Sequence, residues 1–185
     1  MDILSHGLWA GVLAKAQTKK GEPEEATRLP WWQAFFWGIF PDLFAFTVPF
    51  VWTMYTVFTQ GTELPTPDKT EPPAGEGAMY ALALSLYNIS HSLFVFGLVA
   101  LLAWYLLGRF PKVLLGWPLH ILMDIPTHTA HFFPTPLLWP LSSVTFAHGI
   151  SWAQWWFVLL NYSTLLLVYA LLARWRAKAS LINVT

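Results

Sequence analysis

Four titratable side chains lie close together in HILMDIPTHTAH, a stretch that is otherwise largely apolar. They are His120, Asp124, His128 and His131, and at about 100° per helical residue they fall on a stripe roughly 80° wide. Imidazole and carboxylate groups four residues apart on one helix can hold a single metal ion. The alternative is a set of hydrogen bonds between helices. Pro126 leaves the geometry open, because it either bends the helix or places His128 and His131 beyond the helix end.

The composition around this stretch is that of a membrane protein. Hydrophobic residues make up 56% of the 185 residues and charged residues only 11%, whereas soluble domains carry roughly 25% charged residues. The formal net charge is zero, which gives no support for nucleic-acid binding. Because the chain has no cysteine, any metal must be held by His, Asp or Glu.

Apolar runs predict an all-α fold, a polytopic membrane bundle of about five proline-interrupted helices in one domain over residues 1–185. The runs are Ile3–Ala16, Trp31–Gln60, Ala78–Leu107, Phe110–Phe133 and Ile150–Ala173. Prolines occur inside the second and fourth runs, whereas the third is continuous. The first run is short, and it either crosses the membrane or lies at its interface.

The basic residues predict the orientation in the cell membrane. Nine of the ten Lys and Arg lie between the first and second runs, between the third and fourth, or after the fifth. The tenth, Lys69, lies in an acidic loop rich in Pro and Gly at 61–77. We therefore expect a multi-pass protein with this loop and the N-terminus outside and the C-terminus in the cytoplasm.

Three further titratable side chains lie inside the predicted helices. Asp42, in FPDLF, is near the middle of the second run, where a carboxylate that only caps a helix is costly and a cation would offset the cost. His91 is near the middle of the third run, and His6 is near the outer end of the first. Polar neighbours that could fix the His91 imidazole, or join helices instead, are Asn88, Ser90 and Ser92. His148 is placed in the outer loop.

No basic side chain falls inside the predicted membrane layer to balance Asp42 and Asp124. Two carboxylates and several imidazoles without a counter-charge indicate a divalent cation. Oxygen and nitrogen ligands suit Zn²⁺ best, with Mn²⁺, Fe²⁺ or Ni²⁺ also compatible. The ligand set allows one or two ions, and Asp124 could bridge a pair.

The order of these motifs resembles the YdjM-like membrane-bound metal-dependent hydrolases. The motifs are SHGLWAG, FPDLF, SHSL, HILMDIPTH and FFPTPLLWPLS, which together cover most of the chain. That family is distantly similar to zinc-dependent phospholipase C and related nucleases, which hold clustered zinc ions through a His, an Asp, a His and an HxxxD pair. The matching residues, in order, are His6, Asp42, His91, His120 and Asp124, followed by His128 or His131. The resemblance implies that these residues are the metal ligands.

The chain departs from those patterns in three places. Nothing in the sequence obviously replaces the N-terminal tryptophan ligand of the soluble enzymes, and no acidic residue follows Asp124 to form their late HxxxE pair. Leu86 and Tyr87 stand where many YdjM-like members have His–Arg. The missing Arg weakens the case for an anionic phosphoester more than the case for metal binding.

These residues together predict an integral-membrane metal-dependent hydrolase that acts on a phosphoester or ester, such as a membrane lipid, through metal-activated water. The expected catalytic residues are Asp42, Asp124 and His128. Asp42 would orient or deprotonate the water, and His128 and His131 would bind a second ion or carry protons.

Two alternatives to the hydrolase remain. One is a non-enzymatic metal- or proton-binding protein or transporter, since proline-broken helices with a His/Asp stripe also suit an ion pathway. The other is a structural membrane protein without a metal.

Overall fold

A computed structural model describes residues 1–16, 29–61, 77–130, 132–146 and 148–182. Within these ranges the chain forms α-helices and one short 3₁₀ helix, and no strand. The elements are α1 (Ile3–Ala16), α2 (Trp31–Gln60), α3 (Ala78–Ser90), α4 (Leu93–Leu107), η1 (Lys112–Leu115), α5 (Gly116–Asp124) and α6 (Trp155–Ile182). The predicted all-α class is confirmed, with six α-helices in the described ranges in place of about five. Most of the acidic loop at 61–77 lies outside them.

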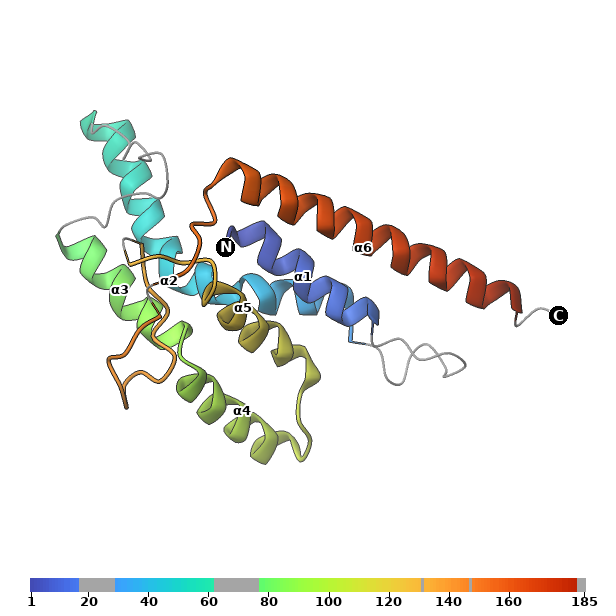
Figure 1. Ribbon diagram of the computed structural model, residues 1–185. Helices are drawn as coiled ribbons and strands as arrows, with labels where there is room; N and C mark the ends of the chain where they lie inside the picture. The colour runs from blue at the N-terminus through green and yellow to red at the C-terminus, as the bar shows by residue number, and fades with distance from the viewer. Residues whose placement is uncertain (17–28, 62–76, 131, 147, 183–185) are drawn as a thin grey trace.

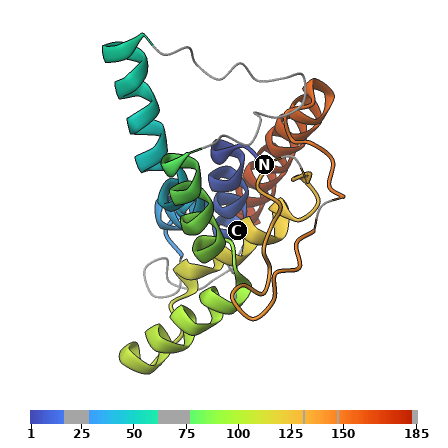
Figure 2. The same cartoon turned by 90° about the vertical axis from the view of Figure 1, so that its left-hand side faces the viewer.

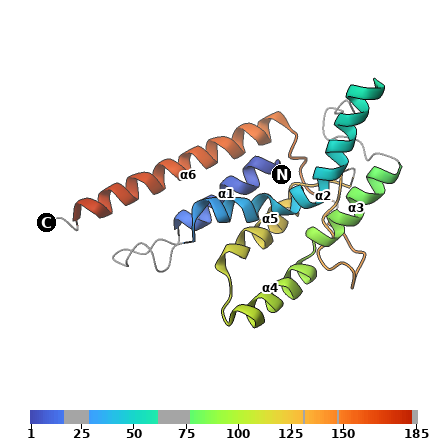
Figure 3. The ribbon, with the colours of Figure 1, turned by 180° about the vertical axis from the view of Figure 1, so that it is seen from behind.

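Helices α1, α2 and α5 form the centre of the fold (Figure 1). Helix α6 runs alongside α1 and extends beyond it, as the view from behind also shows (Figure 3). The second half of α2 and helix α4 diverge from this centre in different directions (Figure 2). The central helices therefore meet the start of α6, the end of α3 and the loop after α5 in one small region.

Small residues let α1 and α2 approach closely in that region. A methyl group added to Gly38 of α2 would lie 2.6 Å from the Cβ atom of Ala10 and 2.7 Å from the main-chain oxygen of His6. Ala34 and Ala45, on the same helix, are fully buried. Close backbone contact through small residues is how membrane helices commonly pack, and here it brings the His6 side of α1 against α2.

Helix α2 has the predicted bounds, but neither of its prolines ends it. It runs through Pro41 and Pro49 to Gly61, whose φ of 65° is the left-handed conformation that glycine adopts at a helix end. Asp42 therefore lies inside a continuous helix. The expectation that prolines interrupt this run is wrong for α2.

The composition of the apolar run Ala78–Leu107 suggested one continuous helix, but the structure has two. It is divided into α3 and α4, which meet at an angle of 57°. Ser92 begins α4, because its Oγ accepts a hydrogen bond from the Val95 main-chain nitrogen at 3.3 Å. The same Oγ donates to the Trp139 main-chain oxygen at 2.6 Å. The break leaves His91 at the end of α3, next to the bend.

The predicted helix over Phe110–Phe133 is shorter than expected. Its helical part ends with α5 at Asp124, ahead of Pro126, and Pro118 lies in the first turn of α5 where proline is tolerated. The chain beyond α5 folds back on itself through a bridge between Thr129 and His148. The last helix begins later than predicted, at Trp155 instead of Ile150.

Two helices are long and apolar enough to cross a membrane: α2 and the Trp155–Ala177 part of α6. The bent pair α3–α4 would be a third if it forms one span. Large apolar side chains on these helices are exposed, including Phe58, Tyr105 and Leu166. Exposed apolar surface of this extent is unfavourable in water and suits a lipid environment.

Candidate metal centre

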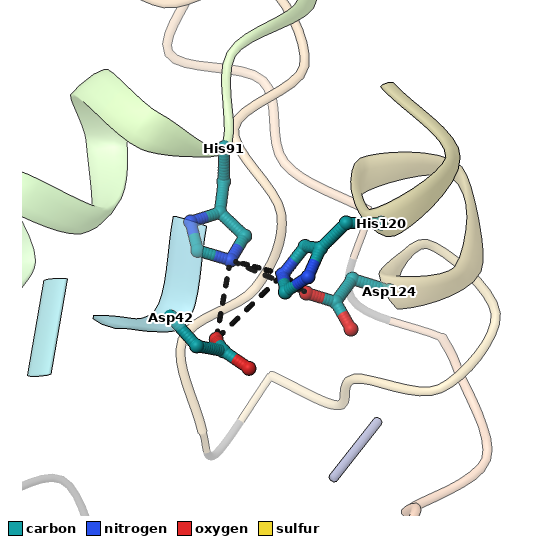
Figure 4. A group of neighbouring side chains, drawn as sticks. All are labelled: Asp42, His91, His120 and Asp124. Atoms are coloured by element: carbon teal, nitrogen blue, oxygen red, sulfur yellow. Dashed lines mark hydrogen bonds and ion pairs between the residues drawn. The ribbon is translucent and has the colours of Figure 1, made fainter. Parts of the chain in front are cut away.

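Four buried side chains from three parts of the chain meet at the centre of the fold: Asp42 from α2, His91 from the end of α3, and His120 and Asp124 from α5 (Figure 4). One ligand atom from each lies within 4.8 Å of every other. His91, His120 and Asp124 are fully buried, and Asp42 is 7% exposed. We call these four residues the central quartet.

The spacing inside the quartet matches a tetrahedral metal site. Ligand atoms about 2.0–2.1 Å from Zn²⁺ lie about 3.3 Å from one another at tetrahedral angles. The His91 and His120 Nε2 atoms are each 3.6 Å from Asp42 Oδ1, and they are 3.3 and 3.1 Å from Asp124 Oδ2. The two Nε2 atoms are 2.9 Å apart. These five separations scatter around the tetrahedral value, and all four ligand atoms lie close enough together to bind one metal ion.

Main-chain oxygens fix the orientation of both quartet histidines. His120 Nδ1 lies 2.7 Å from the Gly38 oxygen, and His91 Nδ1 lies 3.2 Å from the Tyr87 oxygen. A carbonyl oxygen can only accept, so each Nδ1 carries the hydrogen. In the neutral rings the lone pairs are then on Nε2. Two lone pairs that face each other at 2.9 Å repel, and a cation placed between them removes that repulsion.

Ser90 completes the support of His91. Its Oγ lies 2.9 Å from His91 Nδ1 and donates to the Pro41 main-chain oxygen at 3.1 Å. Because that donation uses the hydroxyl hydrogen, Oγ is an acceptor toward the imidazole. The ring of Tyr87 also stacks on His91, with centroids 3.7 Å apart. Ser90 therefore contacts the His91 imidazole, as its position beside His91 suggested.

A second group of nitrogens surrounds the other oxygen of Asp124. His6 Nε2 lies 2.9 Å and His128 Nε2 3.3 Å from Asp124 Oδ1, and the Met1 amino nitrogen is 2.5 Å from the same atom. The two Asp124 oxygens therefore face different partners, with Oδ2 toward the quartet and Oδ1 toward this group. The His6 ring also stacks on His120 at 3.6 Å.

His128 lies beyond the end of α5, which is one of the two alternatives that Pro126 left open. Its Nδ1 lies 2.9 Å from the Phe133 main-chain oxygen and 3.1 Å from the Tyr87 hydroxyl, so its Nε2 is turned toward Asp124. Gly149 makes this placement possible, because a methyl group there would lie 2.2 Å from the His128 main-chain oxygen. The returning loop thus holds His128 through its backbone.

Several buried polar atoms at the centre have no hydrogen-bond partner among the described residues. They are both ring nitrogens of His6 and the Oδ2 atom of Asp124. His6 Nε2 is close to Asp124 Oδ1 but is not aligned for a hydrogen bond. Buried polar atoms are rarely left unsatisfied. Lone pairs that converge without hydrogen bonds are what a cation site requires.

The remaining predicted site residues lie apart from this arrangement or outside the described chain. His131 is outside the described residues. His148 is exposed and bridges Thr129. Ser92 caps α4 and contacts Trp139, so its hydroxyl serves the bend and not the His91 ring. Asn88 is half-buried, and within the described ranges no hydrogen bond joins it to His91.

Sequence reasoning considered only polar side chains inside the membrane, and it therefore missed two contributors. One is the Met1 amino nitrogen, which no side chain marks in the sequence. Tyr87 was noted only as a departure from a family pattern, although its position four residues before His91 on a helix could have indicated a ring contact. The main-chain oxygens of Gly38 and Phe133 leave no signal in a sequence.

A cavity of about 140 Å³ opens beside the centre. Asp42 and His128 line it, together with the apolar side chains Ile3, Phe46, Phe132 and Trp152 and with Met1. Asp42 and His128 are the cluster members that a small molecule in this cavity would meet first. The arrangement can therefore hold a cation on one side and present a carboxylate and an imidazole to a ligand on the other.

No family model matches the chain, and comparisons with curated proteins and with solved structures also found no match.

Proposed function

We propose that the protein is an integral-membrane metal-dependent hydrolase of the YdjM-like type. Its central quartet, formed by Asp42, His91, His120 and Asp124, would hold a divalent ion, with Zn²⁺ the best match to the ligand set. The observation that carries the proposal is the pair of inward-facing Nε2 atoms 2.9 Å apart, each fixed by a main-chain oxygen behind it. Bonds to a cation account for that arrangement directly.

The second group around Asp124 Oδ1 is the proposed place of a second ion, which would replace the Met1 ammonium that contacts Asp124 Oδ1 and His128 Nε2. His6 and His128 would supply its imidazole ligands, and the carboxylate of Asp124 would bridge the two positions. The Nε2 atom of His6 lies near Asp124 Oδ1 without a hydrogen bond among the described residues, which favours this assignment over a hydrogen-bonded histidine. The chemistry that bound divalent ions supply here is Lewis-acid activation of water and of the substrate oxygen.

Asp42 is suited to act on the water. One of its oxygens faces the two quartet histidines, and the other points away from them (Figure 4). Since Asp42 also lines the cavity, the free oxygen can orient a water molecule and accept its proton. The protonated Asp42 would then return this proton to the leaving group, since the Nε2 of His128 is assigned to the second ion and its Nδ1–H faces the Phe133 oxygen. The substrate would be a phosphoester or ester, and a membrane lipid could reach the site from the bilayer.

The membrane arrangement is part of the proposal. Five spans, with α1 and the η1–α5 segment as short ones, would place the N-terminus and the cavity toward the outer face. The C-terminus after α6 would be cytoplasmic, as the basic residues favour. The exposed apolar surfaces of α2, α4 and α6 support insertion in lipid.

Metal analysis of the purified protein tests the proposal. The full chain is expressed in metal-replete medium and purified in detergent, and bound transition metals are measured by mass spectrometry. We expect one to two equivalents of zinc in the wild type and loss of metal in His120→Ala and Asp124→Ala. His148→Ala is the matched control, because this exposed histidine lies outside the cluster and should leave the metal content unchanged.

A panel of carboxylic esters, phosphodiesters and phosphomonoesters then tests hydrolysis by the metal-loaded wild type. Metal-dependent turnover of any of them supports the enzyme. A wild type without metal, or metal content that is equal in His120→Ala and His148→Ala, would refute the metal centre. Bound metal without hydrolysis across the panel, together with metal or proton flux in vesicles, would replace the hydrolase with a transporter.

A further inference from the structure

The cavity beside the metal centre has a continuous aromatic wall that begins next to the polar groups. Phe132 lies 5.8 Å from the His128 ring, 6.4 Å from Phe46 and 6.4 Å from Trp152, measured between ring centroids. These rings come from α2 and from both arms of the returning loop. Ile3, at the start of α1, faces the same space. We call Ile3, Phe46, Phe132 and Trp152 the apolar collar.

The apolar collar starts about one helical turn from Asp42, the proposed base. Phe46 follows Asp42 by four residues on α2, so their side chains are neighbours on one helix face. A group bound at Asp42 and His128 would meet apolar surface directly, without an intervening polar zone. The cavity volume of about 140 Å³ suits a small polar group and the first carbons of an attached chain. Neither Lys nor Arg is among the described residues that line it.

From this geometry we infer that the substrate is an amphiphile with its apolar chain attached directly to the reacting group, as in a fatty acyl ester. The inference rests on the proposed hydrolase and specifies its substrate class. The acyl carbonyl would lie at Asp42 and His128, and the first methylenes would contact Phe46, Phe132 and Trp152.

Hydrolysis in this arrangement balances without a further reactant. A water oxygen bonds to the acyl carbon, and the bond between that carbon and the alcohol oxygen breaks. Asp42 accepts the proton of the water and then passes it to the leaving alkoxide, so the carboxylate returns to its ionised form. The products are a carboxylic acid and an alcohol. The carboxylate product keeps the polar group and the chain of the substrate, so short carboxylates can serve as binding probes.

Binding of two fluorinated carboxylates tests the collar without requiring catalysis. Dissociation constants for trifluoroacetate and 6,6,6-trifluorohexanoate are measured by ¹⁹F NMR on the purified full chain, with and without added zinc. We expect the six-carbon probe to bind at least about tenfold more tightly, because its extra methylenes leave water for the collar. Equal affinity of the two probes for the wild type would overturn the inference.

Two neighbouring substitutions separate the cavity from partition into detergent. Ile3→Trp places a bulky ring in the cavity and should remove the preference for the longer probe while metal content is kept. Leu4→Trp is the control, because Leu4 is exposed, is adjacent in sequence and is not among the residues that line the cavity. It should keep the preference. Identical behaviour of the two variants would also overturn the inference.

A variant that enlarges the cavity gives an independent result. Trp152→Ala should raise kcat/KM for a branched p-nitrophenyl ester relative to the hexanoate ester, whereas unchanged selectivity contradicts the collar.

The experiments distinguish failure of the collar inference from failure of the proposed hydrolase. Metal-dependent hydrolysis without chain-length dependence removes the collar alone. Chain-length-dependent binding that Ile3→Trp abolishes, in a protein without metal or turnover, keeps the collar and removes the enzyme.

Discussion

The Nε2 atoms of His91 and His120 face each other at 2.9 Å, and the Nδ1 atom of each ring is directed at a main-chain oxygen. The rings come from segments 29 residues apart in the chain. Neither can turn away without leaving a buried N–H group unpaired, which costs roughly 1–3 kcal/mol. The two rings are therefore held in place, and under the proposed metal site the groups behind them should control how tightly a shared cation is bound.

Loss of the Ser90 hydroxyl should weaken metal binding. Ser90→Ala removes the group 2.9 Å from His91 Nδ1 and its bond to Pro41, so the imidazole is less well oriented. We expect zinc affinity, measured by competition with a chromophoric chelator, to fall about 10–100-fold. The control is Ser85→Ala on the same helix, an exposed serine whose hydroxyl donates to Ala81. Equal affinity of the two variants would contradict the orienting role.

A methyl group at Gly38 should disturb both packing and the metal centre. Gly38→Ala places Cβ 2.6 Å from Ala10 and 2.7 Å from the His6 oxygen, so α1 and α2 must separate. We expect a loss of about 1–3 kcal/mol in stability to denaturant in detergent, together with weaker zinc binding. Gly97→Ala in α4 is the control, because an added methyl meets no atom within 4 Å there. If Gly38→Ala is as stable as Gly97→Ala, the close contact is not required.

Substitution of Asp42 should separate binding from catalysis. Asp42→Asn keeps an oxygen ligand but removes the base, so hydrolysis should fall about 10²–10⁴-fold while most of the metal is retained. The measurements are kcat on the preferred ester and zinc content of the same sample. Asp2→Asn is the comparison, since the Asp2 carboxylate bonds Ser5 and Tyr162 outside the cluster. Unchanged kcat in Asp42→Asn rules out the assigned role.

Attachment of α6 should depend on Asn161. This buried side chain accepts from Trp9 at 2.9 Å and donates to Ser5 at 2.6 Å, which links α6 to α1 next to His6. Asn161→Ala should lower stability in detergent by about 1 kcal/mol, since such bonds between membrane helices are individually modest. Thr164→Ala, which loses only a bond to Leu160 within α6, should be near neutral. Asn161→Ala should unfold at a lower temperature than Thr164→Ala. Equal unfolding temperatures would contradict the role of Asn161.

Much of the helical framework could be predicted from apolar runs. Ile3–Ala16 and Trp31–Gln60 have the predicted bounds, because charged or turn-forming residues flank both runs. The break between α3 and α4 was not predicted, since hydropathy does not register a serine cap inside an apolar run. Contacts from Trp139 and Leu137, far along the chain, stabilise that break.

The central quartet was also accessible from sequence, because titratable residues are rare in apolar helices and stand out by type alone. The position of His128 was not, since it depends on how the loop returns through Gly149. The apolar collar was likewise hidden. Phe46, Phe132 and Trp152 are three aromatic residues in a chain that contains 12 Trp and 14 Phe, and only the fold distinguishes them.

Main-chain carbonyl groups orient three of the histidines around Asp124. The Nδ1 atoms of His120, His91 and His128 face the main-chain oxygens of Gly38, Tyr87 and Phe133, respectively. A main-chain oxygen is retained whatever side chain occupies the position. The walls of the cavity, by contrast, are made by side chains. Variation in the walls can therefore change which molecules enter the cavity while the backbone that orients the histidines stays the same. If the proposed hydrolase is correct, such a chain could diversify its substrates without rebuilding the candidate metal centre.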